Sequence, residues 1–238
     1  MNKTRVDERG LFIKEVTCPV CLMVFETRKL RTSAVRIKKR HADYYTEYQG
    51  ENPTFYNVLV CPQCGYSGLE KTYQNITEKQ KESIVNNISH NWISREFGGV
   101  RTVHDAIEAY RLALLCHNLI GSEKSVIGKL CIRLMWFYRS VNDKKEMDFA
   151  KYAVESFEEA YLNENLDDDL DNELTILYLV GELHRTLGHY EKAVYWFGQA
   201  VNHPNIKKKR HIEMRARDQW SLAREQYNQS KKRYKLKC

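Results

Sequence analysis

Two cysteine pairs of the same form constrain this chain more than any other feature. Cys18 and Cys21 belong to "CPVC", and Cys61 and Cys64 belong to "CPQC", which Gly65 follows. Two residues between cysteines allow both sulfur atoms of a tight turn to face one ion, and the glycine supplies positive φ where the turn leaves that ion. Two such turns complete the tetrahedral four-cysteine site that Zn²⁺ favours. The pattern therefore predicts one structural Zn²⁺ bound by these four cysteines.

The 39 residues between Cys21 and Cys61 exceed the roughly 15–20 of the usual spacing. Loop-closure entropy adds only about 0.6 kcal/mol per doubling of loop length, whereas structural zinc contributes on the order of 10–16 kcal/mol in small modules. A redox C-x-x-C, an iron–sulfur cluster and simple burial are the alternatives. A redox motif needs only one cysteine pair, near a βαβ pattern. Nothing in the sequence suggests an electron-transfer partner for an iron–sulfur cluster, and simple burial would not repeat the C-P-x-C motif. Four cysteines leave no position for a reactive water, so we expect the metal to be structural.

The segments around both cysteine pairs are typical of β-strands. "LFIKEVTC" and "FYNVLVC" each lead into a pair, "LMVFETRK" leaves the first, and β-branched and aromatic residues dominate all three. "YQGENPTF" contains Gly50, Asn52 and Pro53 and is predicted to turn. We therefore predict a β-rich zinc-ribbon domain over residues 1–75, with an insert at 28–54.

The insert is basic and aromatic. Residues 28–41 contain seven Lys or Arg and no acid, and tyrosines follow directly. Basic side chains beside aromatic rings suit single-stranded nucleic acid, which binds through phosphate contacts and base stacking. The candidate contacts are Arg36, Lys38, Lys39 and Arg40. The alternative is a strand with one solvated face, in a small domain whose aromatics form its core.

From residue 76 onward the sequence favours helices. Apolar residues recur at spacings of three and four, and Pro204 is the only proline in this part. Thr77 with Gln80 predicts a capped start for the first helix. Further helices are expected near 102–118, 123–141, 145–162, 172–187, 190–202 and 207–233. The fold class is therefore α+β, with an all-α domain over residues 76–238.

The segment "LTILYLVGELHRTLGHYEKAVYWFGQAVNHP" resembles a tetratricopeptide repeat. Its matching positions are Gly181, Gly188, Tyr190, Ala193, Phe197 and Ala200. Earlier units match only in their second helices, and the basic segment 207–233 would be the solvating cap helix. The resemblance implies a groove for a peptide or partner helix, lined by Thr175, Tyr178, Glu182 and Arg185. The alternative is a mixed surface on helices that only pack.

Composition indicates a globular protein. The hydrophobic content is 42% and the charged content 29%, the polar start lacks a signal-peptide pattern, and the longest apolar runs are shorter than the roughly 18–20 residues of a membrane span. We expect a soluble, cytoplasmic protein without membrane association. Residues 142–173 carry a net charge of −9 and residues 206–238 a net charge of +9. These segments could pair within one chain or between chains, so the oligomeric state stays open.

"CPVC", the basic insert, "GENPTFYNVLVCPQCGYSG" and the helical tail together resemble a bacterial domain-of-unknown-function family. Its cytoplasmic members carry paired C-P-x-C motifs and are common in Gram-positive bacteria. This resemblance spans nearly the whole chain and implies an architecture but no activity. We found no nucleophile elbow, phosphate-binding glycine loop or metalloprotease motif, so an enzyme has the least support. The leading hypothesis is a non-enzymatic zinc-binding scaffold for protein–protein interaction, and the alternative is a nucleic-acid-associated factor that binds through the insert.

Overall fold

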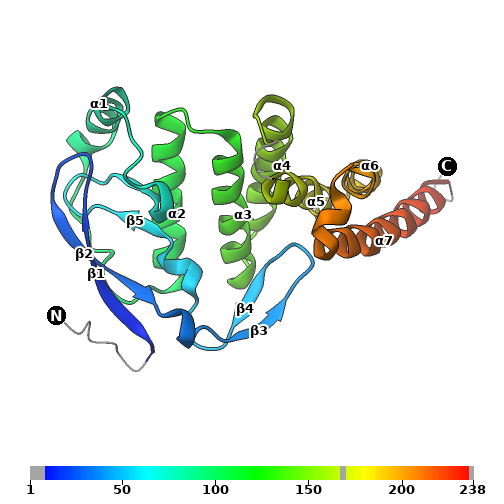
Figure 1. Ribbon diagram of the computed structural model, residues 1–238, viewed down its shortest axis with the longest axis horizontal. Coiled ribbons are helices and arrows are strands. Elements are labelled where there is room, and N and C mark those ends of the chain that lie inside the picture. Colours follow the sequence, from blue (N-terminus) through cyan, green and yellow to red (C-terminus); the bar gives the residue numbers. More distant parts are fainter. Residues whose placement is uncertain (1–8, 167–169, 236–238) are drawn as a thin grey trace. The chain divides into compact units, whose positions relative to one another are not determined.

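The computed structural model describes residues 9–166 and 170–235. Its strands all lie within residues 11–69, and helices make up most of the remaining chain (Figure 1). The α+β class is therefore confirmed. Residues 167–169 of the predicted acidic segment and residues 236–238, which include Cys238, lie outside the described residues.

The strands form three two-stranded antiparallel sheets. Their bounds are β1 Leu11–Thr17 with β2 Val24–Leu30, β3 Ile37–Arg40 with β4 Thr46–Tyr48, and β5 Val58–Val60 with β6 Ser67–Leu69. The pairing brings Thr17 opposite Val24 and Val60 opposite Ser67. Each cysteine pair thus occupies the turn of a hairpin, as the strand pattern around both pairs predicts.

Seven α-helices lie in the described ranges, and they agree with the helices expected from periodicity. They are α1 Glu78–Asn87, α2 Val103–Leu119, α3 Lys124–Ser140, α4 Lys145–Asn163, α5 Leu170–Thr186, α6 Tyr190–Asn202 and α7 Arg210–Lys235. The expected capping box of Thr77 and Gln80 is present at the start of α1. A second capping box, Thr102 with Asp105, starts α2. No helix among the described residues has the length and apolar character that crossing a membrane would require.

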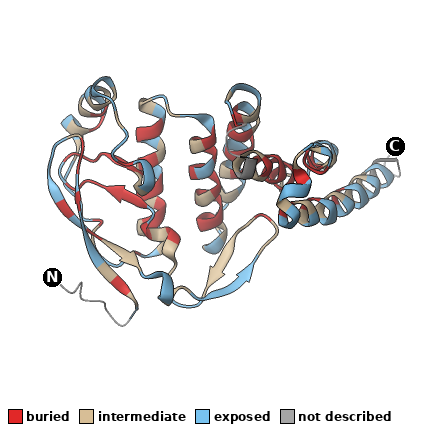
Figure 2. Cartoon of the chain, in the orientation of Figure 1, coloured by how far each residue is buried: buried red, intermediate tan, exposed pale blue. Residues whose placement is uncertain are grey.

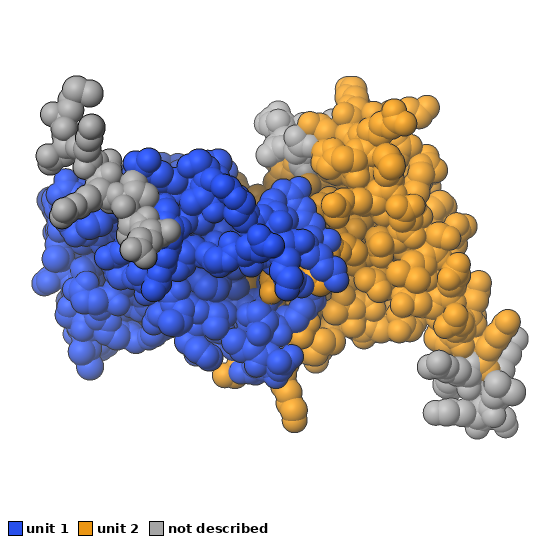
Figure 3. All heavy atoms as spheres, turned by 90° about the horizontal axis from the view of Figure 1, so that it is seen from below, with its two compact units in different colours: residues 1–40, 46–122, 136–143 blue, residues 41–45, 123–135, 144–238 orange. Residues whose placement is uncertain are grey.

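The described chain forms two compact units (Figure 3). Unit 1 contains the residues up to Arg40, Thr46–Ser122 and Trp136–Asp143, and unit 2 contains His41–Tyr45, Glu123–Met135 and the residues from Lys144 onward. This division differs from the boundary at 75/76 that composition predicts.

The difference arises because α1 and α2 share the core of the β-rich region. Ile84 of α1, Ile88 directly after that helix and Cys116 of α2 belong to the same buried cluster as Cys18 and Cys61. Figure 2 shows buried residues along β5 and on α2. Short two-stranded sheets bury too little apolar surface to be stable alone, so the helices complete this core.

Arg101 is the principal polar anchor inside unit 1. Its side chain is buried, and its guanidinium donates to the carbonyl oxygens of Phe55 and Val58 at 2.8 Å each and of Phe97 at 3.0 Å. Burial lowers the pKa of Arg101 to about 10. The backbone N–H of Arg101 also donates to the Tyr56 hydroxyl. One side chain therefore ties the start of α2 to the segment before β5.

Unit 2 contains two contacts in which a helical glycine faces an aromatic ring on the following helix. A Cβ added to Gly181 of α5 would lie 2.8 Å from the Phe197 ring of α6, and one added to Gly128 of α3 would lie 2.6 Å from the Phe157 ring of α4. Only glycine permits such close approach. Gly128 lies farther from its inter-helix turn than Gly181 does, so the two helix pairs are not in the same register.

Candidate metal centre

The four predicted ligands converge in unit 1. The sulfur atoms of Cys18, Cys21, Cys61 and Cys64 all lie within 4.8 Å of one another. Cys18 Sγ is 3.6 Å from Cys64 Sγ, and Cys21 Sγ is 3.5 Å from Cys61 Sγ. Metal–sulfur bonds of about 2.3 Å in a tetrahedron place sulfurs about 3.8 Å apart. All four cysteines are free thiols, so the cluster could bind one metal ion.

The two cysteine turns have the same backbone hydrogen bonds. In the first turn Cys18 N–H donates to Met23 O and Leu22 N–H donates to Cys18 O, at 2.9 and 3.0 Å. In the second turn the corresponding bonds start from Cys61 and Gly65, at the same two distances. The residue after the second cysteine has positive φ in both turns, 63° at Leu22 and 74° at Gly65. The positive φ predicted at Gly65 is therefore confirmed, and the first turn achieves it with leucine.

Residues after α1 support the second turn. The Trp92 indole N–H donates to Pro62 O at 2.8 Å, and the Ser89 hydroxyl donates to Cys64 O at 2.9 Å. A Cβ at Gly65 would lie 2.5 Å from two atoms of the Trp92 ring. Sequence analysis missed Ser89 and Trp92, because no spacing rule links a helix 25 residues downstream to a cysteine turn.

The close approach of Cys18, Cys61 and Cys64 shifts the pKa values of their thiols in different directions. Hydrogen bonds from Cys61 and Cys64 lower the pKa of Cys18 to about 2. The hydrogen bond with Cys18 raises the pKa of Cys61 to about 12 and also raises that of Cys64. One thiolate is thus stabilised at the expense of its neighbours. A divalent cation would stabilise all four as thiolates, because it supplies the positive charge that the site lacks.

The cysteines differ in exposure. Cys21 is exposed, whereas the other three members of the cluster are buried. Cys116 and Cys131 are also buried, and burial raises the pKa of each to about 12. Cys116 Sγ accepts a hydrogen bond from Ser67 N–H at 3.3 Å. Both are therefore packed thiols outside the four-sulfur cluster.

The family comparison agrees with this architecture. A family model described as "Uncharacterized protein conserved in bacteria (DUF2225)" matches residues 11–223. The chain belongs to this family. The match covers most of the helices and both cysteine pairs, so all four cysteines of the candidate metal centre lie within the family match. Searches of curated proteins and of solved structures each found no match.

The four residues predicted to line a groove lie on α5 but are not an open surface. Tyr178 and Glu182 are fully buried, and Thr175 and Arg185 are half-buried. The Tyr178 hydroxyl donates to Ala42 O at 2.7 Å. Glu182 accepts two hydrogen bonds from Arg185. Tyr178 and Glu182 are therefore not accessible here, because the turn between β3 and β4 packs against this part of α5, and the predicted groove stays a prediction.

The four predicted nucleic-acid contacts lie on or beside β3 and are exposed. Lys38 forms an ion pair with Glu47 at 3.5 Å. Arg36 donates to Ser33 O and Val35 O, at 2.6 and 3.1 Å. Lys39 and Arg40 complete the set. This strand therefore presents several cations to solvent, as expected of its sequence.

Glu158 of α4 joins three helices of unit 2. Its Oε1 lies 2.8 Å from His184 Nε2 of α5 and accepts from the Trp196 indole N–H of α6 at 3.1 Å. His184 is buried, and burial lowers its pKa against the opposing effect of Glu158. The Glu158 carboxylate thus links α4 to both α5 and α6 through hydrogen bonds. Sequence analysis found neither His184 nor Glu158, because no spacing rule links residues on separate helices.

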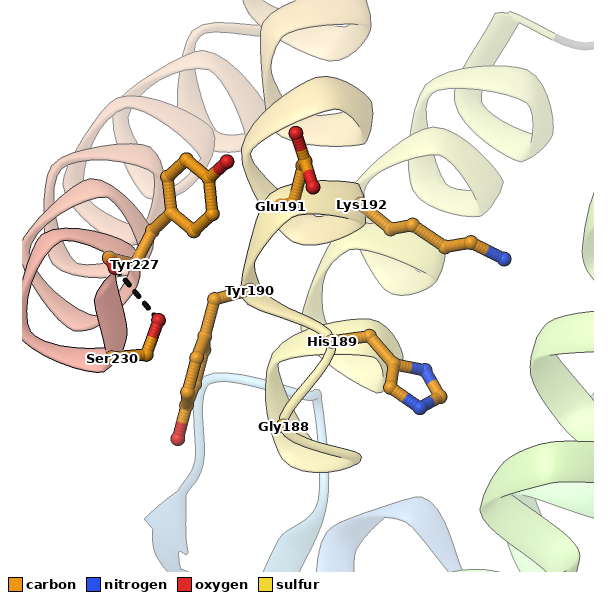
Figure 4. A pocket seen from close by; sticks show the side chains of 7 residues that line it. All are labelled: Gly188, His189, Tyr190, Glu191, Lys192, Tyr227 and Ser230. Carbon is orange, nitrogen blue, oxygen red and sulfur yellow. Dashed lines mark hydrogen bonds between the residues drawn. The ribbon is translucent and has the colours of Figure 1, made fainter. Parts of the chain in front are cut away.

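A surface pocket in unit 2 lies where the turn between α5 and α6 faces α7. It is lined by Gly188, His189, Tyr190, Glu191, Lys192, Tyr227 and Ser230. Tyr190 and Tyr227 lie near Ser230, whose hydroxyl donates to Tyr227 O, whereas His189 and Lys192 extend the opposite way (Figure 4). The polar groups therefore do not converge on one point, and the pocket has the character of an aromatic contact surface.

Proposed function

We propose that this protein is a zinc-dependent scaffold: one Zn²⁺ organises unit 1, and unit 2 binds a protein partner. The observation that carries the proposal is the closed four-sulfur cluster. Thiolate ligands select zinc over magnesium or calcium, and four of them leave no position for substrate. The zinc is therefore structural. A cytoplasmic location belongs to the proposal, because the cytosol keeps thiols reduced.

Metal analysis tests the zinc part. Purified full-length protein should contain one zinc per chain by elemental analysis, and Cys61→Ser should lose it. Cys131→Ala is the matched control, because Cys131 is buried outside the cluster, and it should retain full zinc. Iron in place of zinc, or full zinc in Cys61→Ser, would refute the assignment.

The scaffold part rests on the helix pair α5–α6. The spacing of Gly181, Ala193, Phe197 and Ala200 resembles a tetratricopeptide repeat, and the contact between Gly181 and the Phe197 ring supports this interpretation. Stacked repeats of this kind bind peptides on the surface of their first helices. Tyr178 lies on that helix. The proposed binding surface is therefore α5 together with the elements that pack against it.

A binding measurement tests the scaffold part. The full-length protein serves as bait in its own cell, and a co-purifying protein is then expressed and titrated against purified variants. All three proteins also carry Tyr44→Gly, because the Tyr178 hydroxyl otherwise holds the turn between β3 and β4 at Ala42 O. Tyr178→Phe combined with Arg185→Lys keeps the volume and charge of the surface but alters its hydrogen bonds. This change should weaken partner binding at least about ten-fold, which corresponds to about 1.4 kcal/mol. Tyr195→Phe, at an exposed position of α6, is the control. Equal affinity in all three proteins would refute the binding surface.

Nucleic-acid binding through β3 is the second candidate function. Its support is the exposure of Lys38, Lys39 and Arg40 on β3 and of Arg36 directly before it. Phosphate contacts make such binding salt-dependent. Replacing the four cations with glutamine should abolish binding of a single-stranded oligonucleotide at near-physiological salt. Absence of binding by the unmodified protein would remove this candidate.

A further inference from the structure

The turn between β3 and β4 is seated on the proposed binding surface. Its residues, His41–Tyr45, belong to unit 2. The Tyr178 hydroxyl donates to Ala42 O at 2.7 Å, and the Arg215 guanidinium of α7 donates to His41 O at 3.5 Å. Both bonds are to backbone carbonyls of the turn. Side chains of α5 and α7 thus hold this segment in the way that a binding surface holds a peptide.

One aromatic side chain of the turn is enclosed between these helices. The Tyr44 ring lies 5.2 Å from the Tyr178 ring, and the Arg215 guanidinium lies 5.2 Å from the Tyr44 ring centroid. Tyr178 in turn packs on Phe197 at 5.8 Å. Aromatic pairs and cation–π contacts of this geometry are attractive in addition to the burial of apolar area. Tyr44 is therefore the main anchor of the turn.

An acidic side chain precedes the anchor. Asp43 is buried and accepts a hydrogen bond from Tyr45 N–H at 3.2 Å, which stabilises the turn. Asp43 also contributes to the electrostatic field at Arg185. Tyr44 has a φ of 65°, so the turn presents the acid and the ring in a fixed, tight conformation. A ligand of this surface should therefore carry an acidic residue directly before the aromatic one, because the acid fixes the turn in which the ring is presented.

The hairpin that carries the turn consists of two short strands. β3 and β4 pair only with each other among the described strands, and every residue of β3 is exposed. An isolated two-stranded hairpin is marginally stable. Contacts of the turn with α5 and α7 therefore add to the stability of the hairpin, and local opening of so small a segment requires little free energy.

We propose that His41–Tyr45 is an internal ligand of the α5–α7 surface, and that the external partner displaces it with a turn in which an aromatic residue follows an acidic one. This inference rests on the scaffold function proposed above and adds the chemistry of the partner and the competition that controls its access. A tethered ligand acts at an effective concentration of about 1 mM. The partner therefore binds more weakly while the turn is seated.

Fluorescence titration with a defined peptide tests the proposal. The probe is a labelled, cyclised peptide with the sequence of residues 40–46, and the control probe has Tyr44→Ala. In full-length protein, Tyr44→Gly removes the ring while keeping the positive φ, because glycine adopts it freely. This variant should bind the probe at least about ten-fold more tightly than the unmodified protein, and Tyr178→Phe added to it should weaken binding. Equal affinity of both proteins, or equal binding of both peptides, would overturn the proposal.

Hydrogen exchange gives a second readout that needs no variant. Saturating probe added to the unmodified protein should increase amide exchange at residues 41–48 and decrease it along α5. Bound probe without faster exchange of the turn would overturn the proposal. A partner that binds the unmodified protein and Tyr44→Gly equally would refute the internal ligand but keep the scaffold function. Displacement by the probe without any cellular partner would keep the internal ligand and refute the scaffold.

Discussion

Leu22 and Gly65 occupy equivalent positions in the two cysteine turns, but substitutions there should change stability in opposite directions. Both residues have positive φ. Leu22 has a side chain that is 73% exposed, so it stabilises the fold little by burial while its backbone is strained by about 1–2 kcal/mol. Leu22→Gly removes that strain, and the greater entropy of glycine in the unfolded chain offsets about 0.5–1 kcal/mol. We expect a net stabilisation of about 0.5–1 kcal/mol.

Gly65→Ala should destabilise unit 1. The added methyl group meets two atoms of the Trp92 ring at 2.5 Å and Ile88 Cγ2 at 3.0 Å. Overpacking of this kind costs about 1–3 kcal/mol, the positive φ adds about 1 kcal/mol, and a displaced ring loses the bond to Pro62 O, worth about 1 kcal/mol. These contributions sum to about 3–5 kcal/mol, and the lower entropy of alanine in the unfolded chain offsets about 0.5–1 kcal/mol. The expected destabilisation is therefore about 2–4.5 kcal/mol.

Urea denaturation of zinc-saturated protein, followed by circular dichroism, measures both changes. Gly65→Ala combined with Trp92→Ala is the decisive control, because removing the ring removes the clash and should make the two effects strongly non-additive. Additive effects would refute the clash. Destabilisation by Leu22→Gly would refute the strain assigned to the first turn.

Three further changes test other parts of the structure. Arg101→Met leaves three buried carbonyl groups without their donor and should cost about 2–4 kcal/mol of unfolding free energy in urea; a loss below about 1 kcal/mol would contradict the anchoring role. Burial lowers the pKa of His117 from 6.5 to about 4, so the unfolded chain takes up the proton first as pH falls, and stability present above pH 6.5 is lost towards pH 4. The unmodified protein should therefore lose up to about 3 kcal/mol of unfolding free energy over this pH range, whereas His117→Gln should not show this loss. Parallel stability–pH curves for the two proteins would contradict this prediction. Glu158→Ala removes an acceptor shared by α5 and α6 and should lower stability by about 1–3 kcal/mol in thermal melts. The control Glu159→Ala, at the neighbouring exposed position, should change stability by less than about 1 kcal/mol. Equal effects of the two substitutions would refute the role of Glu158 in joining the helices.

Much of the candidate site follows from local sequence rules. Two C-P-x-C motifs predict that all four cysteines lie together, because a tight turn at the end of a hairpin points both of its sulfur atoms to one side. The strands that flank Cys18 and Cys61, and the capping box at Thr77, also follow from local preferences. These features depend on residues within a few positions of each other.

The contacts of the proposed binding surface on α5 required the tertiary structure. Repeat spacing places Tyr178 and Glu182 on the surface-facing side of a first helix, but both are buried. The residues that cover them lie more than 130 positions earlier in the sequence. No periodicity within α5 can indicate that contact, and tyrosines in the insert fit nucleic-acid stacking equally well.

By itself, the sequence determined the fold class, the secondary-structure elements and the four sulfur ligands, because each of these depends on short-range geometry and on the periodicity of apolar residues. Only the tertiary structure decided that α1 and α2 complete the core around the cysteine turns and that the turn at Tyr44 lies against α5 and α7. The physical reason is that burial and aromatic stacking are non-local. They reward whichever surfaces the folded chain brings together, whatever their separation in sequence.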